Sequence, residues 1–435
     1  MITLEMLEKI TEGKLINGKN SFVKTIEGFE FNSRKIKKGK VFIPLEGKRD
    51  GHNFIEDAAK NGALATLTSK KIETLIPQIA VKDTLNAFVK IANFKRKLFK
   101  GKTVAITGSV GKTTTKELLS HVLSNFFTCK SNIESYNNMI GVSYTLSNLK
   151  NPDIYIQEIG TSAPGEIRKL TNIVKPEIAI LTTVSPAHLE GFENIEALKE
   201  EKLSIFTKNK ITIAPVEFKN RLKNGIFFGK GGDASFTEIS SQPNKTVFKA
   251  KIMGENIRGT IKIPGKGILN SILIILIIAK LVEIDLKKAT EILESFTSPK
   301  WRMEIRHLKN TILIKDFYNA NPASMKNAID VLANFNMPKV AIFGEMLELG
   351  KNSKFFHEEI GKYLNEKKVE TGIFFGENSI FYLNTFNGKG YHFKDKNELI
   401  AFLKKIDIRK KVFLIKGSRG NRLEEVTHII EKRLE

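Results

Sequence analysis

Residues 107–114, TGSVGKTT, constrain the fold more than any other part of this sequence. The apolar run 103–106 precedes them, and a segment with helical spacing begins at Lys116. A buried strand therefore meets a helix through a loop whose two glycines remove the Cβ atoms that would block a tight turn. The backbone N–H groups and the positive end of such a helix can converge on phosphate oxygens. The stretch predicts a phosphate-binding loop in an α/β domain.

The polar side chains of this loop have expected tasks. Lys112 would bring a positive charge to the outer phosphates, and the Thr113 hydroxyl would lie where Mg²⁺ bridges them. The usual pattern, GxxxxGK[ST], begins with glycine, whereas this chain has Ile106 there. An ordinary strand-to-helix turn with a surface lysine is the alternative, but the strand–loop–helix context favours a phosphate site. We expect ATP to bind along Thr107, Gly108, Ser109, Gly111, Lys112, Thr113 and Thr114.

The charge of the chain is strongly positive but spread evenly. Lys and Arg number 70 against 47 Asp and Glu, which gives a formal net charge of +23. Such a charge favours anionic partners, including nucleotides, nucleic acid and acidic membrane surfaces. The lysines run through the whole chain, however, and no basic stripe with interleaved aromatic residues stands out. We therefore expect no specific nucleic-acid partner.

Other features predict a cytoplasmic protein. The single cysteine, Cys129, rules out an internal disulfide and fits a reducing compartment. Glu5 and Glu8 interrupt the N-terminal stretch, where a secretory signal would have a basic start and an apolar core. The most apolar run, residues 272–279, is far shorter than the roughly 20 residues that span a bilayer, so it predicts a buried helix. We expect a monomer without a membrane span.

The length of 435 residues allows about three domains at roughly 150 residues each. Short segments predict a small N-terminal α/β domain, and longer alternation of strands and helices predicts a mostly parallel central sheet covered on both faces. A β-rich insertion near residues 227–263 follows, and then a third, doubly wound α/β unit. The predicted domains are 1–100, 101–297 and 298–435, with strands expected at 40–43, 78–81, 104–107, 154–159, 178–183, 211–215, 311–315, 339–343, 371–375 and 411–415.

Polar residues that close apolar runs are candidates for chemistry, because ligands of open α/β sheets bind beyond the carboxyl ends of the strands. Glu158 closes one such run and can hold a hard cation; the alternative is an edge carboxylate that faces solvent. His188 follows the next strand. A lone histidine is more often structural than a ligand, but parallel neighbouring strands would place it with Glu158 near the phosphate loop. Lys202 lies in a predicted helix among charged residues, where a solvated face is the simpler interpretation.

Several motifs resemble the Mur ligase superfamily of ATP-dependent amide ligases. TGSVGKTT is similar to the ATP loop shared across that superfamily. DFYNANPASM at residues 316–325 and GEMLELG at residues 344–350 resemble the branch that adds D-alanyl-D-alanine. His357 follows at the spacing of that branch, and KGSRG at residues 416–420 also fits. The sister ligases that add single amino acids usually have histidine where this chain has Asn321.

The resemblance implies an N-terminal domain for a UDP-sugar, a central ATPase and a C-terminal Rossmann-like domain for the incoming amine. The implied reaction joins D-Ala-D-Ala to UDP-N-acetylmuramoyl-tripeptide through an acyl phosphate, in peptidoglycan precursor synthesis. The implied catalytic residues are Lys112, Glu158, His188 and Lys202. Two Mg²⁺ ions are implied, one on Thr113 and Glu158 and one on His188 and a carbamylated Lys202.

The same resemblance carries further site residues over to this chain. It places Asn270, Arg302 and Asp316 on ATP, and Lys416 to Arg419 in the acceptor region. It places Ser33, Arg34, Asn137, Asn138, Tyr318, Asn319, Asn321 and Ser324 on the substrates. Because contacts from separate domains must converge, we expect the domains to close when ATP binds.

Two alternatives stay open. One is another amide ligase of the superfamily, such as a folylpolyglutamate synthase or a ligase that adds one amino acid. The other, suggested by the charge of +23, is a nucleotide-regulated RNA-binding protein, whose binding would weaken steeply with salt.

Overall fold

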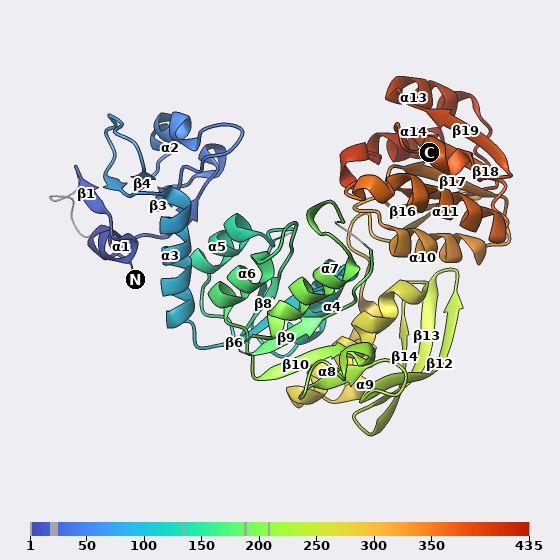
Figure 1. Cartoon of the computed structure of the whole chain (residues 1–435), viewed down its shortest axis with the longest axis horizontal. Coiled ribbons are helices and arrows are strands. Elements are labelled where there is room, and N and C mark those ends of the chain that lie inside the picture. The colour runs from blue at the N-terminus through green and yellow to red at the C-terminus, as the bar shows by residue number, and fades with distance from the viewer. Residues whose placement is uncertain (1, 18–24, 134, 187–188, 208, 435) are drawn as a thin grey trace.

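The chain folds into three units, each built on its own β-sheet (Figure 1). The computed structural model describes residues 2–17, 25–133, 135–186, 189–207 and 209–434. The units follow one another along the chain, and we call them the N-terminal, central and C-terminal units. This mixed α/β architecture confirms the predicted fold class. In the part of the chain that the structure describes, no helix has both the length and the apolarity to cross a bilayer.

The N-terminal unit has a five-stranded sheet in the order β1-β5-β4-β3-β2. Strands β2 to β5 run parallel, whereas β1 pairs antiparallel with β5. Leu7 of α1 and Phe88 of α3 are buried against this sheet. Ala92, one turn further along α3, belongs to the core of the central unit, so this helix joins the two units. The elements are α1 (Leu4–Thr11), β1 (Lys14–Ile16), β2 (Gly28–Glu30), β3 (Lys40–Phe42), α2 (Ile55–Lys60), β4 (Ala65–Thr68), β5 (Gln78–Ala80) and α3 (Thr84–Leu98).

The central unit has a nine-stranded sheet in the order β14-β13-β12-β11-β10-β9-β6-β8-β7. Strands β6 to β12 pair in parallel, and β13 and β14 continue from β12 as an antiparallel meander. The strands are β6 (Lys102–Thr107), β7 (Cys129–Ser131), β8 (Ile154–Glu158), β9 (Ile178–Leu181), β10 (Ile211–Pro215), β11 (Ile226–Phe228), β12 (Ala234–Gln242), β13 (Lys245–Ile252) and β14 (Glu255–Ile261).

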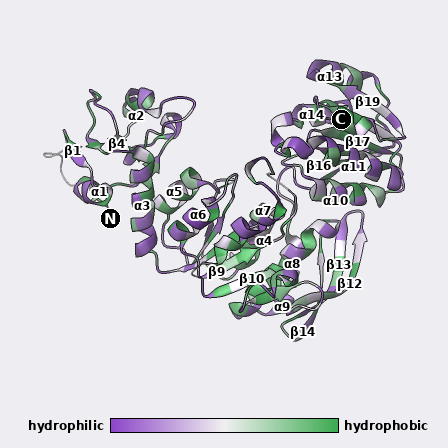
Figure 2. Ribbon diagram, in the orientation of Figure 1, coloured by the Kyte–Doolittle hydropathy of each residue, from purple (hydrophilic) through white to green (hydrophobic). Residues whose placement is uncertain are grey.

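Helices cover both faces of the central sheet. On one face, α4 packs against α8 and α9, and on the other α5 and α6 pack with the end of α3. Helix α8 is buried from Ser271 to Ala279, because its sequence has no polar face to present to water. Figure 2 shows the hydrophobic colouring gathered around β9, β10 and α8. The helices are α4 (Lys112–Leu123), α5 (Met139–Ser147), α6 (Glu166–Val174), α7 (Ile195–Leu203), α8 (Leu269–Leu281) and α9 (Leu286–Ser295).

The C-terminal unit has a six-stranded sheet in the order β15-β16-β20-β17-β18-β19, parallel except for β15. The chain passes from β16 to β17 across β20, so the strand order reverses there and the carboxyl ends of these strands border a crevice. The elements are β15 (Glu304–Leu308), β16 (Thr311–Asp316), α10 (Pro322–Ala333), β17 (Lys339–Gly344), α11 (Ser353–Glu366), β18 (Thr371–Phe375), α12 (Ile380–Leu383), β19 (Lys389–Phe393), α13 (Lys396–Lys405), β20 (Val412–Lys416) and α14 (Glu424–Leu434).

Helix α10 begins where the sequence has a strong start signal. The Ser324 N–H donates to the Asn321 side chain, the Asn321 N–H donates to Ser324 Oγ, and Pro322 is the first helical residue. The helix reaches the central unit, because Gly267 N donates to Asn327 Oδ1 at 2.7 Å. The N-terminal end of α10 is thereby held close to the phosphate loop.

All ten expected strands are confirmed in position, with ends that differ by a few residues. Six strands outside the β-rich insertion are missing from the prediction: β1, β2, β4, β7, β15 and β19. All of them except β4 lie at sheet edges, and the side chains of β7 and β19 are only partly buried, without a run of apolar residues.

Candidate active site

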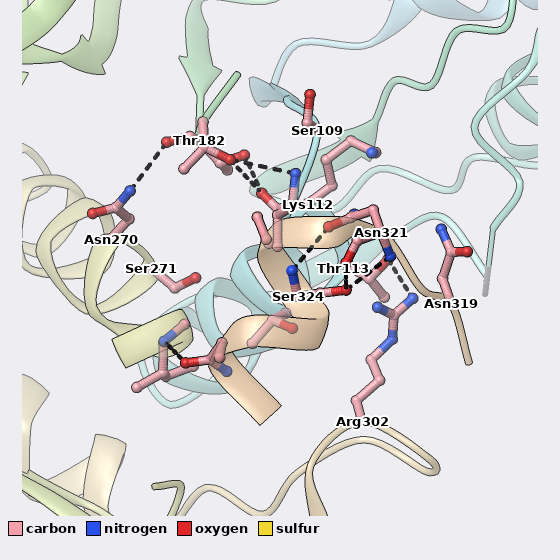
Figure 3. Close-up of a pocket in the computed structure, with 18 of the residues that line it drawn as sticks. Ser109, Lys112, Thr113, Thr182, Asn270, Ser271, Arg302, Asn319, Asn321 and Ser324 are labelled. Carbon is pink, nitrogen blue, oxygen red and sulfur yellow. Dashed lines mark hydrogen bonds between the residues drawn. The ribbon is translucent and has the colours of Figure 1, made fainter. Parts of the chain in front are cut away.

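A cavity of about 780 Å³ lies between the central and C-terminal units. Its walls come from the phosphate loop, from the start of α8 and from the segment between β16 and α10 (Figure 3). These segments are far apart in the sequence. The cavity therefore exists only because the carboxyl ends of the central and C-terminal sheets face each other.

The phosphate loop has the geometry expected of an anion site. Gly111 is the N-cap of α4 with φ +86°, and no side chain of the described residues caps this helix. The first N–H groups of α4 are therefore left for an external acceptor, at the positive end of the helix. Gly108 has φ +147°, and a Cβ there would overlap with the Thr182 side chain. Both glycines are thus required by the backbone.

The segment that follows β9 braces the loop from behind. Thr182 Oγ1 donates to the Val110 carbonyl at 2.6 Å, and Ser109 N donates to the Thr183 carbonyl at 2.8 Å. Ser109 Oγ donates to the Ser185 carbonyl at 2.8 Å. These contacts fix the loop before any ligand binds, so little ordering entropy opposes phosphate binding.

Lys112 bends back over its own loop. Its Nζ donates to the Gly108 carbonyl at 2.7 Å. Burial among protein atoms lowers the pKa of Lys112, and the Glu158 carboxylate acts in the opposite direction. An incoming phosphate would offer this ammonium a stronger, charged acceptor than a carbonyl.

Glu158 at the end of β8 is held from two sides. Thr113 Oγ1 donates to its Oε2 at 2.7 Å, and Asn137 Nδ2 donates to its Oε1 at 2.8 Å. The carboxylate is almost fully buried, at 2% exposure. A hydroxyl and a carboxylate are hard oxygen ligands of the kind that Mg²⁺ prefers, and here they lie side by side next to the phosphate loop. These residues fit a magnesium site.

The C-terminal unit contributes a cation to the same place. Arg302 Nη2 donates to Thr113 Oγ1 at 3.0 Å, across the boundary between the two units (Figure 3). Its guanidinium also lies 4.0 Å from the centre of the Tyr318 ring. Residues 189 positions apart in the sequence therefore meet at one hydroxyl group.

Most of the predicted site residues meet at this cavity. The lining includes Ser109, Gly111, Lys112, Thr113, Thr114, Asn137, Glu158, Asn270, Arg302, Asp316, Tyr318, Asn319, Asn321 and Ser324.

Several predicted residues do not line the cavity. Thr107 and Gly108, at the start of the loop, are not part of the lining, and Thr107 Oγ1 donates to the Ile159 carbonyl at 2.9 Å. Asn138 caps α5 by accepting the Gly141 N–H at 3.0 Å. Ser33 and Arg34 form a short 3₁₀ turn (Ser33–Lys35) in the N-terminal unit. His188 lies outside the described residues.

Lys202 of α7 is buried instead of facing solvent. Its side chain is 1% exposed. Burial lowers the pKa of Lys202 far below its usual value, and the positive charge of Lys112 lowers it further. The simple interpretation of a solvated helix face is therefore wrong.

Sequence reasoning missed other residues that line the cavity, among them Thr182, Thr183, Ser185, Lys266, Ser271 and Asn327. A signal existed for the first three, because they are polar residues that directly follow the apolar strand β9. Asn327 carried no such signal, since it lies within a helix and reaches the site only through packing between units.

Comparisons with known proteins place the chain among peptide ligases. Residues 106–279 match the Mur ligase middle domain, and residues 301–419 match the Mur ligase glutamate ligase domain. The chain is 34% identical to UDP-N-acetylmuramoyl-tripeptide–D-alanyl-D-alanine ligase of Rickettsia prowazekii over 420 residues, which cover 91% of this chain and 93% of that protein.

Solved structures agree. The crystal structure of MurF from Acinetobacter baumannii has a TM-score of 0.92 at 27% identity and covers 99% of this chain and 98% of that one. MurF ligase from Thermotoga maritima, solved with ADP, has a TM-score of 0.85 at 29% identity and covers 94% of this chain and 98% of its own. The chain belongs to the Mur ligase family and, within it, to the UDP-N-acetylmuramoyl-tripeptide–D-alanyl-D-alanine ligases.

Proposed function

We propose that this protein uses ATP to join D-Ala-D-Ala to UDP-N-acetylmuramoyl-tripeptide, as a step of peptidoglycan synthesis. One observation carries the proposal: the cavity combines a phosphate loop from the central unit with Arg302 and the start of α10 from the C-terminal unit. A ligase of this kind must hold a nucleotide and an amine against one carboxylate, and a cavity between two units allows that approach.

The chemistry requires a carboxylate to become reactive toward an amine. Its oxygen is a poor leaving group, so the tripeptide carboxylate attacks the γ-phosphate of ATP and becomes an acyl phosphate, with ADP as the leaving group. The amine of D-Ala-D-Ala then attacks the acyl carbon and displaces phosphate. Two anions must approach each other in the first step, so alignment and charge neutralisation are the main tasks of the site.

The residues of this chain divide those tasks. The N–H groups at the start of α4 and the ammonium of Lys112 hold the phosphates, and Arg302 approaches the same phosphates from the C-terminal unit. Asn270 and Asp316 complete the nucleotide contacts. Asn137 would contact the tripeptide end, since it lines the cavity and its amide donates to Glu158.

Thr113 and Glu158 would hold one Mg²⁺. When bound, this ion neutralises phosphate charge. The Thr113 hydroxyl donates to Glu158 and accepts from Arg302, so its second lone pair would be available to the ion.

Lys202 and His188 would hold a second Mg²⁺ once the Lys202 amine has become a carbamate. A buried ammonium would repel the cation. The low pKa of the Lys202 amine favours its neutral, nucleophilic form, which is the form that adds carbon dioxide. The product has an anionic oxygen that can bind the metal.

The acceptor would lie against the start of α10, near Asn319, Asn321 and Ser324. The UDP-sugar would lie on the N-terminal unit, near Ser33 and Arg34, with Asn138 shaping the entry to the tripeptide site. This division assigns residues 1–100 to the UDP-sugar, 101–297 to ATP and 298–435 to the amine. We further propose a monomer, and the single cysteine supports a cytoplasmic location.

A product assay tests the function. Purified protein is incubated with ATP, Mg²⁺, D-Ala-D-Ala and UDP-N-acetylmuramoyl-tripeptides that differ in their third residue. Mass spectrometry should find a product equal to the tripeptide plus the dipeptide minus one water, with one phosphate released per product. Lys112→Met should abolish both signals, and Lys169→Met, at an exposed position of α6, should change neither.

The alternatives give different results. A folylpolyglutamate synthase would release phosphate with glutamate and folate and not with D-Ala-D-Ala. A ligase that adds one amino acid would accept single amino acids. A nucleotide-regulated RNA-binding protein would form no amide at all and would lose RNA steeply with salt.

A further inference from the structure

Lys416, at the end of β20, is a buried lysine whose three N–H groups all have acceptors. Its side chain is 1% exposed. Nζ lies 2.6 Å from Asp316 Oδ2 and also donates to the carbonyls of Asp316, at 3.2 Å, and Asn319, at 3.1 Å. An ammonium has no further donor to offer. Lys416 is therefore not free to bind the acceptor.

The Asp316 carboxylate links this lysine to the segment before β15. Oδ2 accepts from Lys416, while Oδ1 accepts the Met303 N–H at 3.1 Å. The same segment is tied down at Trp301, whose carbonyl accepts the Tyr318 N–H at 3.2 Å. The carboxylate thus connects strand β20 with the backbone directly after Arg302, while the Tyr318 N–H holds the residue directly before it.

That backbone has an uncommon conformation. Trp301 has φ +61° and Met303 has φ +53°, so two residues with side chains adopt left-handed conformations directly before and after Arg302. Such conformations persist only where surrounding contacts hold them. The hydrogen bonds to Asp316 and Tyr318 are contacts of this kind, and they give the turn its shape.

The turn aims Arg302 at the phosphate loop. Its guanidinium is stacked on Tyr318 at 4.0 Å and reaches Thr113 at 3.0 Å. A long side chain on a relaxed turn would sample many directions. The direction observed here depends on the backbone at residues 301–303.

We propose that Lys416 is a positioning residue for Arg302: it orients the Asp316 carboxylate, which holds Met303 and so keeps the left-handed turn that points Arg302 at the nucleotide. The proposal rests on the proposed function, because it concerns the use of ATP. It assigns Lys416 to the ATP half of the reaction, whereas the motif alone suggested the acceptor half.

A double-mutant cycle tests this inference. Lys416→Met removes the ammonium and keeps the length of the side chain. Arg302→Ala removes the guanidinium that Lys416 is proposed to position. Because small misplacements of a reacting group can cost about 100-fold, we expect kcat/KM for ATP to fall by roughly that factor in Lys416→Met. KM for D-Ala-D-Ala should stay within about threefold, on the ordinary scale of uncoupled effects. In the Arg302→Ala background the same substitution should have little further effect.

Two measurements accompany the rates. Calorimetric titration gives the Kd for ATP even in variants that do not turn over. Trp301 is the only tryptophan, and its fluorescence reports the turn directly. Its emission should shift in Lys416→Met but not in the control Glu431→Gln, which weakens the ion pair of another buried lysine, Lys315, in the same unit. If Lys416→Met does not unfold cooperatively, Lys416→Gln replaces it in the cycle.

The results separate two kinds of failure. If the wild type forms no amide product, the proposed function is wrong. If the wild type is active, two outcomes overturn the positioning role. One is that Lys416→Met lowers ATP affinity and rate as much in the Arg302→Ala background as in the wild type. The other is that Lys416→Met raises KM for D-Ala-D-Ala instead. An unchanged rate in Lys416→Met would also overturn it.

Discussion

Gly108→Ala should destabilise the central unit and abolish ATP binding. The residue has φ +147°, which residues with a side chain rarely adopt. A Cβ at this position overlaps with Thr182 Oγ1 and lies 3.1 Å from both the backbone nitrogen and the carbonyl oxygen of Thr183. Two of these three atoms belong to the backbone that braces the loop, so they cannot turn away as the end of a flexible side chain can.

The magnitude follows from two separate costs. Forcing a side chain into such a backbone conformation costs about 1–3 kcal/mol. Overpacking costs about 1–3 kcal/mol more. Gly165→Ala is a matched control, because Gly165 also has positive φ, at +84°, and no described atom lies within 4 Å of a Cβ built there. The control has only the first cost, so the two variants should differ by about 1–3 kcal/mol.

Urea unfolding of the two variants, together with calorimetric titration of ATP, measures both effects. Gly108→Ala should lose stability and ATP binding, whereas Gly165→Ala should keep ATP binding. Adding Thr182→Ala should recover part of the stability in Gly108→Ala, since it removes the overlapping hydroxyl. Equal losses in the two glycine variants, with ATP still bound, would refute the reasoning from the loop geometry.

Three further predictions concern other residues, two in the site and one in the core of the C-terminal unit. Glu158→Gln should lower kcat/KM by about 100-fold or more, because it removes a charged ligand of the proposed cation, and steady-state kinetics at several Mg²⁺ concentrations would check this. Lys202→Ala should abolish turnover and added bicarbonate should not restore it; normal turnover would exclude the carbamate. Burial lowers the pKa of His357 below 6.5, so the unfolded chain takes up the proton first and stability should fall as the pH drops below about 6.5. In His357→Asn the free energy of unfolding should depend less steeply on pH than in the wild type. An unchanged slope would show that His357 does not cause the loss of stability.

The local parts of the fold could be predicted because their cause is local. The phosphate loop, the ten expected strands and helix α8 each lie in one stretch of sequence, where glycine positions or apolar runs dictate the conformation. The edge strands β7 and β19 could not be found in this way. Their side chains are half exposed, so the apolar pattern that marks an inner strand is absent.

The contacts between units could not be read from the sequence. Arg302 meets Thr113, and Lys416 meets Asp316, only because two strand orders bring distant residues to facing sheet edges. A single sequence contains both residues of each pair but does not indicate that they are in contact. Lys202 is a similar case, since its neighbours in the sequence are charged while its side chain turns into the protein.

Positive and negative side chains nearly balance in the cavity wall, so only a few groups can supply positive charge to the reacting phosphate and carboxylate. The chain has a formal charge of +23, yet its cavity wall is nearly balanced. Among the described residues that line it, Lys112, Lys266, Arg302, Lys326 and Lys416 are positive, and Glu158, Glu217, Asp316 and Asp330 are negative. Lys416 and Asp316 neutralise each other at 2.6 Å. Surface lysines are screened beyond roughly 10 Å at 0.1 M salt, so they cannot offset a triphosphate and a carboxylate inside the cavity. The positive charge must come from groups close to the reacting atoms, which are Lys112, Arg302 and the cation that we propose on Thr113 and Glu158.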